Sequence, residues 1–197
     1  MEGKEEVILK VALELFLEKG YENTSLNDIV KITGGSLATI YKKFENKNNL
    51  FLKALKFRAD TRLDNLKDII ASKIHLDLPE FLEVFGNEYC NFFVGEDNAK
   101  FLRLVLERTY KDVIVKRECA KADKDVIVRF LCMVFEQKID KKVLEEISAY
   151  DLANLYCSMI RSNKIFDLIF NSKETFSKAE LSEHVKNVNI LFLRAIR

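Results

Sequence analysis

The chain has 197 residues, a formal net charge of +1, and 48% apolar and 32% charged residues. Such a chain can bury a substantial core in one or two domains, and any strongly basic surface on it must be local. One proline and six glycines supply few turns, which favours long helices over a fold with many β-turns. We therefore expect an all-α protein.

Two functional classes find no support in the sequence. No apolar run approaches the length of a membrane span, since even VIVRFLCMVF contains Arg129, and the acidic start is unlike a signal peptide. We therefore expect a soluble cytoplasmic protein without a membrane partner. We expect no enzyme and no catalytic residues, because Gly-rich phosphate loops, HExxH and GxSxG motifs are missing.

The cysteines give no sign of a metal or cofactor site. They form no CxxC motif, and both histidines, His75 and His184, lie far from them in sequence. We expect neither a metal nor another cofactor, and we expect reduced, buried thiols. Redox sensing remains an alternative role for these four residues, which are Cys90, Cys119, Cys132 and Cys157.

An amphipathic stretch follows the acidic start, and residues 24–50 then predict two short helices joined by a tight turn. Ser25 and Asp28 make an S-x-x-D helix start, in which the serine oxygen accepts a bond from a free backbone N–H. Gly34 and Gly35 can adopt positive φ and let the chain reverse. This is the layout of a helix-turn-helix DNA-binding motif.

The second short helix has one apolar and one polar face. Ser36 can cap it, and helical spacing places Leu37, Ile40 and Phe44 together on the face that we expect to be buried. The opposite face combines small side chains that allow close approach to DNA, hydroxyls that can bind phosphate, and lysines that neutralise it. This outer face and its flanks consist of Ser36, Ala38, Thr39, Tyr41, Lys42 and Lys43.

A third helix should follow directly, with Asn46 as its cap and Lys47 in a first turn that also attracts phosphate. Residues 36–58 carry six basic side chains against Glu45 alone, a local net charge of +5 in a chain that is nearly neutral. Lysines on a helix are often just a solvated face. Joined to the two capped helices and the glycine turn, they favour a footprint on DNA.

At these residues the chain resembles the TetR family of bacterial transcriptional regulators. The resemblance covers about the first 55 residues, which include VILKVALELFLEKGY at 7–21. The matching positions after that stretch are Thr24, Ser25, Leu26, Asp28, Ile29, Gly34, Ser36, Thr39, Ile40, Tyr41, Phe44, Lys47 and Leu50.

The resemblance implies phosphate contacts for Thr24, Ser36, Thr39, Tyr41 and Lys47, and groove contacts for the outer face with Ala38, Lys42 and Lys43. The chain departs from the family at Gly35, where a small branched apolar residue is usual, and at Ala38, where glycine is common. Because the face has no Arg, Gln or Asn, we expect phosphate contacts to dominate affinity and DNA shape to contribute to specificity.

The remaining sequence predicts a helical ligand-binding and dimerisation domain at 47–197, after a three-helix DNA-binding domain at 1–46, with about nine helices in all. Long helices are expected at 46–72, after Pro79, from about 98, and at 112–138, with a turn in 139–148. Two more should cover 149–170 and 177–196, started by the pairs Ser148 with Asp151 and Ser177 with Glu180.

The last two helices are apolar around much of their circumference, so each needs more than one packing partner. The resembled family uses the corresponding pair as a dimer interface, which implies a homodimer through residues 149–170 and 177–196. A two-fold dimer would also suit a palindromic operator in double-stranded DNA. The pattern by itself equally permits a core within one chain.

The resemblance further implies an apolar cavity for a small-molecule effector. Arg161 lies one turn after Cys157 and could anchor a carboxylate or sulfonate, although a surface or interface ion pair explains it equally well. Aromatic residues at helical spacing are often ordinary core. The candidate ligand-binding residues are Phe85, Tyr89, Phe92, Phe101, Phe130, Met133, Cys157 and Arg161.

We therefore expect a ligand-responsive transcriptional regulator that a hydrophobic or amphipathic molecule releases from its operator. Control of efflux genes, common in the resembled family, is one possible target class. The alternatives are a helical carrier of hydrophobic ligands without specific DNA binding, and a redox-sensing regulator that uses its cysteines.

Overall fold

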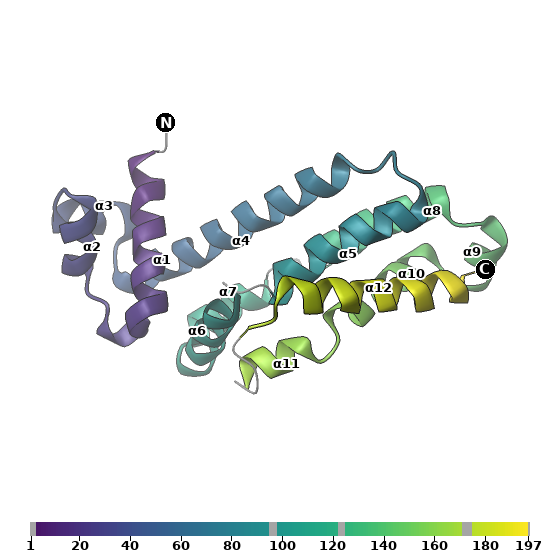
Figure 1. Ribbon diagram of the computed structural model, residues 1–197. Coiled ribbons are helices and arrows are strands. Elements are labelled where there is room, and N and C mark those ends of the chain that lie inside the picture. Colours follow the sequence, from purple (N-terminus) through teal and green to yellow (C-terminus); the bar gives the residue numbers. More distant parts are fainter. Residues whose placement is uncertain (1–2, 95–97, 122–124, 171–174, 197) are drawn as a thin grey trace. The chain divides into compact units, whose positions relative to one another are not determined.

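The computed structural model describes residues 3–94, 98–121, 125–170 and 175–196. Within these ranges the chain forms twelve α-helices and no strand, so the all-α prediction is confirmed and the expected number of about nine helices was too low. The chain divides into two compact units (Figure 1). The first comprises Met1–Leu63 and Lys100–Ala122, and the second Asp64–Ala99 and Asp123–Arg197.

The first unit contains α1 (Lys4–Asn23), α2 (Leu26–Thr33), α3 (Leu37–Phe44), α7 (Val113–Ala120) and the larger parts of α4 (Lys47–Ala71) and α6 (Asn98–Lys111). Residues from all six helices share one apolar core, which includes Ile8, Phe16, Ile29, Ile40, Phe44, Leu50, Phe51, Leu104 and Val115. The unit therefore extends past the boundary predicted at residues 46 and 47, because α4, α6 and α7 complete its core.

The second unit contains α5 (Leu78–Val94), α8 (Val126–Lys138), α9 (Lys141–Glu146), α10 (Ala149–Arg161), α11 (Lys164–Ile169) and α12 (Lys178–Ala195). Helix α10 packs against α5, α8 and α12, and α12 also packs against α5. The buried hydroxyl of Tyr156 donates to Oδ1 of Asn189 at 2.6 Å and lies 3.0 Å from the carbonyl oxygen of Leu82. This polar group connects α5, α10 and α12 inside an otherwise apolar core.

Two long helices of the sequence prediction are divided in the structure. The described parts of the predicted helix 112–138 form α7 and α8, with residues 122–124 outside the description. The predicted helix 149–170 forms α10 and α11, because Ser162 has a φ of 43° and interrupts the helical backbone. The segment predicted as a turn contains the short α9.

The predicted helix starts are confirmed in detail. Ser148 accepts from the amide of Asp151, and Ser177 forms a reciprocal capping box with Glu180. Pro79 lies in the first turn of α5, where its missing N–H removes no helical bond. Among the described residues we find no helix whose length and hydrophobicity would let it span a bilayer.

Gly86 of α5 provides a test of packing in the second unit. A Cβ at this position would lie 2.5 Å from Cγ1 of Val185 and 2.8 Å from Oη of Tyr156, so something must shift to admit it. Overpacking of this kind costs about 1–3 kcal/mol, which should outweigh the gain in helix propensity of up to about 1 kcal/mol. We expect Gly86→Ala to lower the free energy of unfolding in urea denaturation followed by circular dichroism.

Gly3→Ala is the matched control, because a Cβ there has no neighbouring atom within 4 Å. Because Gly3 is the N-cap of α1, where alanine is less favourable than glycine, the midpoint of this variant should fall slightly and by less than that of Gly86→Ala. A Gly86→Ala midpoint equal to or above that of the parent would contradict the close packing described for α5, α10 and α12.

Candidate nucleic-acid interface

The two short helices of the first unit begin where the sequence predicts. The amide of Asp28 donates to Oγ of Ser25 at 3.1 Å, and the Asp28 carboxylate accepts from the amide of Ser25 at 3.1 Å. Hydrogen bonds from the side chain and then the backbone of Ser25 lower the pKa of Asp28. At the start of α3, Oγ of Ser36 accepts from the amide of Thr39 at 3.3 Å. These caps fix the entry of both helices.

The turn between α2 and α3 depends on two glycines. Gly34 has a φ of 71° and Gly35 a φ of 96°, a region that side chains other than glycine rarely adopt. The unusual Gly35 is therefore required by the turn that this chain makes. After α3, Oδ1 of Asn46 accepts from the amide of Asn49 at 2.8 Å, which confirms Asn46 as the cap of α4.

Helix α3 has the predicted division into an inner and an outer face. Ile40 and Phe44 are 2% and 1% exposed, whereas Tyr41 is 52% exposed. Leu37 is half-buried at the edge of the inner face. The outer face carries side chains that lie at the surface, namely Ala38, Lys42 and Lys43 together with Ser36 and Tyr41. Thr39 is half-buried, with its hydroxyl oxygen 3.1 Å from that of Ser36.

The lysines of this region differ in their surroundings. Nζ of Lys43 is 3.0 Å from a carboxylate oxygen of Glu5, and this hydrogen bond lowers the pKa of Glu5. Lys42 is exposed one position earlier on α3. At the first position of α4, Nζ of Lys47 donates to the main-chain oxygen of Glu22 at 3.3 Å and lies 4.3 Å from the ring centroid of Tyr21. Burial lowers the pKa of Lys47.

The burial of Thr24 does not fit the expectation that its side chain contacts phosphate. Its side chain is 1% exposed, and its hydroxyl is hydrogen-bonded to the carbonyl oxygens of Gly20 at 2.8 Å and Leu15 at 3.1 Å. Gly20 has a φ of 79°, which interrupts the helical backbone near the end of α1. The structure thus gives Thr24 a structural role, because its hydroxyl bonds to main-chain oxygens of α1 next to this interruption.

The candidate ligand-binding residues are only partly brought together. In the second unit, the rings of Phe85 and Tyr89 stack at 5.4 Å, and the Tyr89 side chain is hydrogen-bonded to Cys157. Phe92 and Arg161 both contact Phe93, at 5.0 Å between ring centroids and at 5.6 Å from the guanidinium carbon to the ring centroid.

Three other candidates lie elsewhere. Phe101 belongs to the first unit, where its ring lies 4.7 Å from the guanidinium carbon of Arg58. Met133 of α8 is 52% exposed, and Phe130 on the same helix is half-buried. Aromatic spacing along the sequence could not distinguish these surroundings, since core, surface and cavity residues show the same period.

Two cysteines of the second unit are buried and resist ionisation. Burial raises the pKa of Cys90 to about 11 and that of Cys157 to about 12. Because the thiolate is the reactive form, these two residues are poorly suited to redox sensing. Among the described residues, no group of three or more His, Cys, Asp or Glu side chains is arranged to hold a metal ion.

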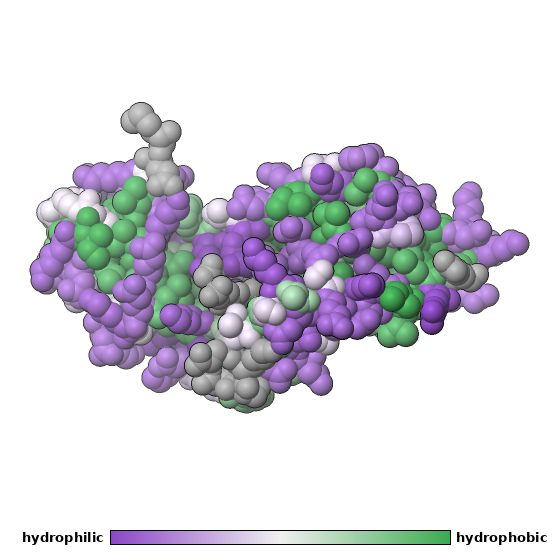
Figure 2. Space-filling view, viewed as in Figure 1, coloured by the Kyte–Doolittle hydropathy of each residue, from purple (hydrophilic) through white to green (hydrophobic). Residues whose placement is uncertain are grey.

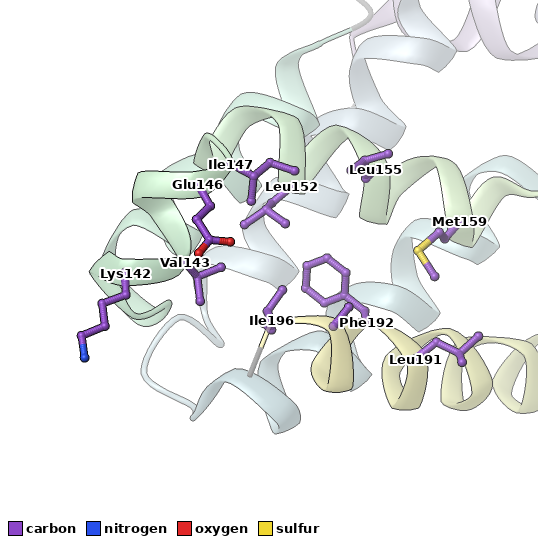
Figure 3. Close-up of a pocket in the computed structure, with 11 residues that line it drawn as sticks. Lys142, Val143, Glu146, Ile147, Leu152, Leu155, Met159, Leu191, Phe192 and Ile196 are labelled. Carbon is purple, nitrogen blue, oxygen red and sulfur yellow. The ribbon is translucent and has the colours of Figure 1, made fainter.

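Sequence reasoning missed a surface hollow in the second unit. It has a volume of about 660 Å³ and lies among α9, α10 and α12 (Figure 3). Lys142 and Glu146 come from α9, while most of the lining is apolar. The only signal in the sequence was the broad apolar circumference of the last two predicted helices. The apolar lining includes Leu152, Leu155, Met159, Leu191, Phe192 and Ile196.

Comparison with known proteins connects this geometry to a family. Residues 8–54 match the family model described as bacterial regulatory proteins, tetR family. The segment is 46% identical over 48 residues to the transcriptional regulator QacR of Staphylococcus aureus, covering 24% of this chain and 26% of QacR. The chain is also 39% identical over 75 residues to the uncharacterized regulator YvdT of Bacillus subtilis, covering 38% of this chain and 37% of YvdT. The match thus spans well under half of either relative.

Solved structures extend the likeness of the fold to nearly the whole chain. A putative TetR-family regulator from Mesorhizobium loti has a TM-score of 0.82 at 21% identity, with 98% of this chain and 96% of that chain covered. The flavonoid-responsive regulator FrrA has a TM-score of 0.68 at 22% identity, with the same coverage. The matched segment and its relatives show that residues 8–54 belong to the tetR family of bacterial regulatory proteins, and the solved structures show that nearly the whole chain shares the fold of such regulators.

Proposed function

We propose that this protein is a dimeric transcriptional repressor that binds a palindromic operator and is released by a small molecule. One observation carries the proposal. The inner face of α3 is anchored by Ile40 and Phe44, so that Ala38, Tyr41 and Lys42 lie at the surface. The same segment falls within residues 8–54, which match a family of DNA-binding regulators.

In this proposal α3 enters the major groove, with Ala38, Lys42 and Lys43 facing the bases. The hydroxyls of Ser36, Thr39 and Tyr41 and the ammonium of Lys47 bind phosphates on either side of the groove. The lack of bidentate readers on α3 favours recognition that relies on phosphates and on the sequence-dependent shape of the duplex. Thr24 is left out of this interface because its hydroxyl is buried.

Exposed apolar side chains on α10 and α12 support a homodimer formed through these helices. Leu155 and Leu191 are 52% and 59% exposed, and both border the apolar hollow. Figure 2 shows hydrophobic side chains among hydrophilic ones on one face of this unit. A second copy packing against α10 and α12 would bury these side chains. It would also supply the second recognition helix that a palindrome requires.

We propose a hydrophobic or amphipathic effector that binds in the second unit near Tyr89, Cys157 and Arg161. The guanidinium of Arg161 lies beside the aromatic ring of Phe93, a setting that suits an apolar molecule with an anionic group. Two structural neighbours have related names, a flavonoid-responsive regulator and a fatty acid degradation regulator from Bacillus halodurans. Efflux genes are one candidate class of target.

Release follows from linkage between two conformations of the dimer. DNA favours the conformation whose recognition helices fit adjacent major grooves, about 34–36 Å apart. The effector favours another conformation, so each ligand weakens the binding of the other to the same extent. A coupling of about 1–3 kcal/mol would change operator affinity roughly 5–150-fold.

The DNA interface is tested by a double substitution on α3 and α4. Tyr41→Ala with Lys47→Ala should abolish specific binding to a duplex that the parent protein selects from a random-sequence pool. Lys47→Ala alone, which removes one phosphate contact in each half-site, should weaken binding and reduce the slope of log K against log salt by about 2. Fluorescence anisotropy measures both quantities, and circular dichroism verifies that the helices are intact.

The matched control is Tyr110→Ala with Lys116→Ala, which removes the same residue types from exposed positions on α6 and α7. It should bind the duplex as the parent does. A protein that selects no duplex at all, while still binding hydrophobic ligands, would favour the carrier function instead.

The dimer interface is tested by Leu191→Glu. A carboxylate in a buried apolar contact is costly, so we expect the variant to be monomeric at micromolar concentration in analytical ultracentrifugation. Tyr110→Glu, at a side chain that is 91% exposed in the first unit, should leave the dimer unchanged. If Leu191→Glu sediments as a dimer, α12 is not at the interface.

The effector site is tested with dodecanoate and dodecanol as probes, an anionic and a neutral molecule of equal chain length. Arg161→Ala should lower the affinity for dodecanoate by about tenfold or more, since a hydrogen bond to a charged group contributes about 1.5–3 kcal/mol. Dodecanol should be nearly unaffected in isothermal titration calorimetry. An equal effect on the two probes would rule out Arg161 as the anchor of an anionic group.

A further inference from the structure

A buried arginine in the first unit connects the end of α1 to α6 and α7. Arg108 is 6% exposed, and its guanidinium carbon lies 3.7 Å from the ring centroid of Tyr21. One terminal nitrogen is 3.1 Å from a carboxylate oxygen of Glu22, and the other is 3.1 Å from a carboxylate oxygen of Asp112. No short sequence pattern indicates this cluster, since Arg108 and Glu22 are 86 positions apart.

Asp112 holds the guanidinium in place. Its Oδ1 accepts from the amides of Ile114 and Val115 at 2.8 and 3.2 Å, as the cap of α7. Its Oδ2 accepts from Arg108. The carboxylate is thus fixed by a helix start, and Arg108 is fixed by the carboxylate and by the Tyr21 ring. The other terminal nitrogen of Arg108 donates to Oε1 of Glu22.

Lys47 shares these neighbours but binds them differently. Its ammonium lies over the same Tyr21 ring and donates to the main-chain oxygen of Glu22, whereas the Glu22 carboxylate accepts from Arg108. The Glu22 charge acts on Lys47, since it raises the pKa of Lys47 against the lowering by burial. Glu22 thus bonds to Lys47 through its main-chain oxygen and to Arg108 through its carboxylate.

We propose that Arg108 is a positioning residue for DNA binding, which holds the carboxylate of Glu22 and so keeps the ammonium of Lys47 available for a DNA phosphate. The inference rests on the proposed function, because it requires Lys47 to contact DNA. Without Arg108, the Glu22 carboxylate loses its partner. It then pairs with Lys47 and takes the place of the DNA phosphate. The positive charge of Arg108 also repels Lys47, since both cations lie over the Tyr21 ring.

The test measures DNA affinity and its salt dependence for Lys47→Ala, Arg108→Met, their combination, and Arg108→Met with Glu22→Gln. We expect Arg108→Met to weaken binding about tenfold and to reduce the salt slope by up to about 2 per dimer, as Lys47→Ala does. In the Lys47→Ala background, Arg108→Met should have little further effect. Glu22→Gln should restore most of the affinity and the slope that Arg108→Met removes.

The rescue separates positioning from mere support of the fold. The side chain of Glu22 is 66% exposed, so neutralising it cannot repair a core damaged by loss of Arg108. Arg117→Met, an equal loss of charge at an exposed position of α7, controls for general attraction to DNA. Arg108→Gln, which keeps a hydrogen-bond donor for Asp112, replaces Arg108→Met if the latter does not fold.

Different results would contradict the phosphate contact of Lys47 and the positioning role of Arg108. If Lys47→Ala leaves affinity and slope unchanged, the phosphate contact in the proposed function is wrong, whatever Arg108 does. If Lys47→Ala weakens binding but the Arg108 variant binds as the parent does, the positioning role is wrong. The positioning role is also wrong if Glu22→Gln does not restore the affinity of the Arg108 variant. It is likewise wrong if the Arg108 substitution lowers affinity equally in the Lys47→Ala background.

Discussion

The burial of Ile40 and Phe44 is the constraint on which the proposed DNA-binding surface depends. Both side chains are at most 2% exposed, in a core that also includes Ile8 and Phe16 of α1 and Leu50 and Phe51 of α4. A helix of eight residues is too short to be stable alone, so this core provides its stability and fixes its rotation. Rotation decides which side chains reach DNA. The outer face of α3 is therefore a consequence of the packing of its inner face.

Fewer lysines of the first unit are free of neighbouring groups than the number of basic residues in the sequence suggests. The net charge of +5 between residues 36 and 58 includes Lys43, which is paired with Glu5, and Lys47, which is half-buried against Tyr21. The Glu5 carboxylate is bound to Lys43 itself, whereas the Glu22 carboxylate is bound to Arg108. In the proposed function, local charge attracts DNA, and the partners of each lysine determine whether that lysine can bind a phosphate.

Features set by a few adjacent residues could be predicted from the sequence. The caps at Ser25, Ser36 and Asn46 and the glycine turn follow from local geometry, and the periodicity of α3 was sufficient to identify its buried face. Features set by distant residues could not be predicted. The burial of Thr24, the break at Ser162 and the contact of Arg108 with Tyr21 depend on backbone conformation and packing that no short pattern encodes. The aromatic residues of the second unit illustrate the same limit, because their spacing does not distinguish core from cavity.

The most direct test of the account is selection of genomic DNA fragments by the purified protein at near-physiological salt, followed by sequencing. We expect the fragments to share an inverted repeat whose half-sites are separated by about one helical turn or slightly more. Such a repeat requires a two-fold dimer whose recognition helices read sequence, and the adjoining genes would indicate the class of effector. Binding that is salt-sensitive but indifferent to sequence, or no binding at all, would contradict the assignment of α3 as a recognition helix.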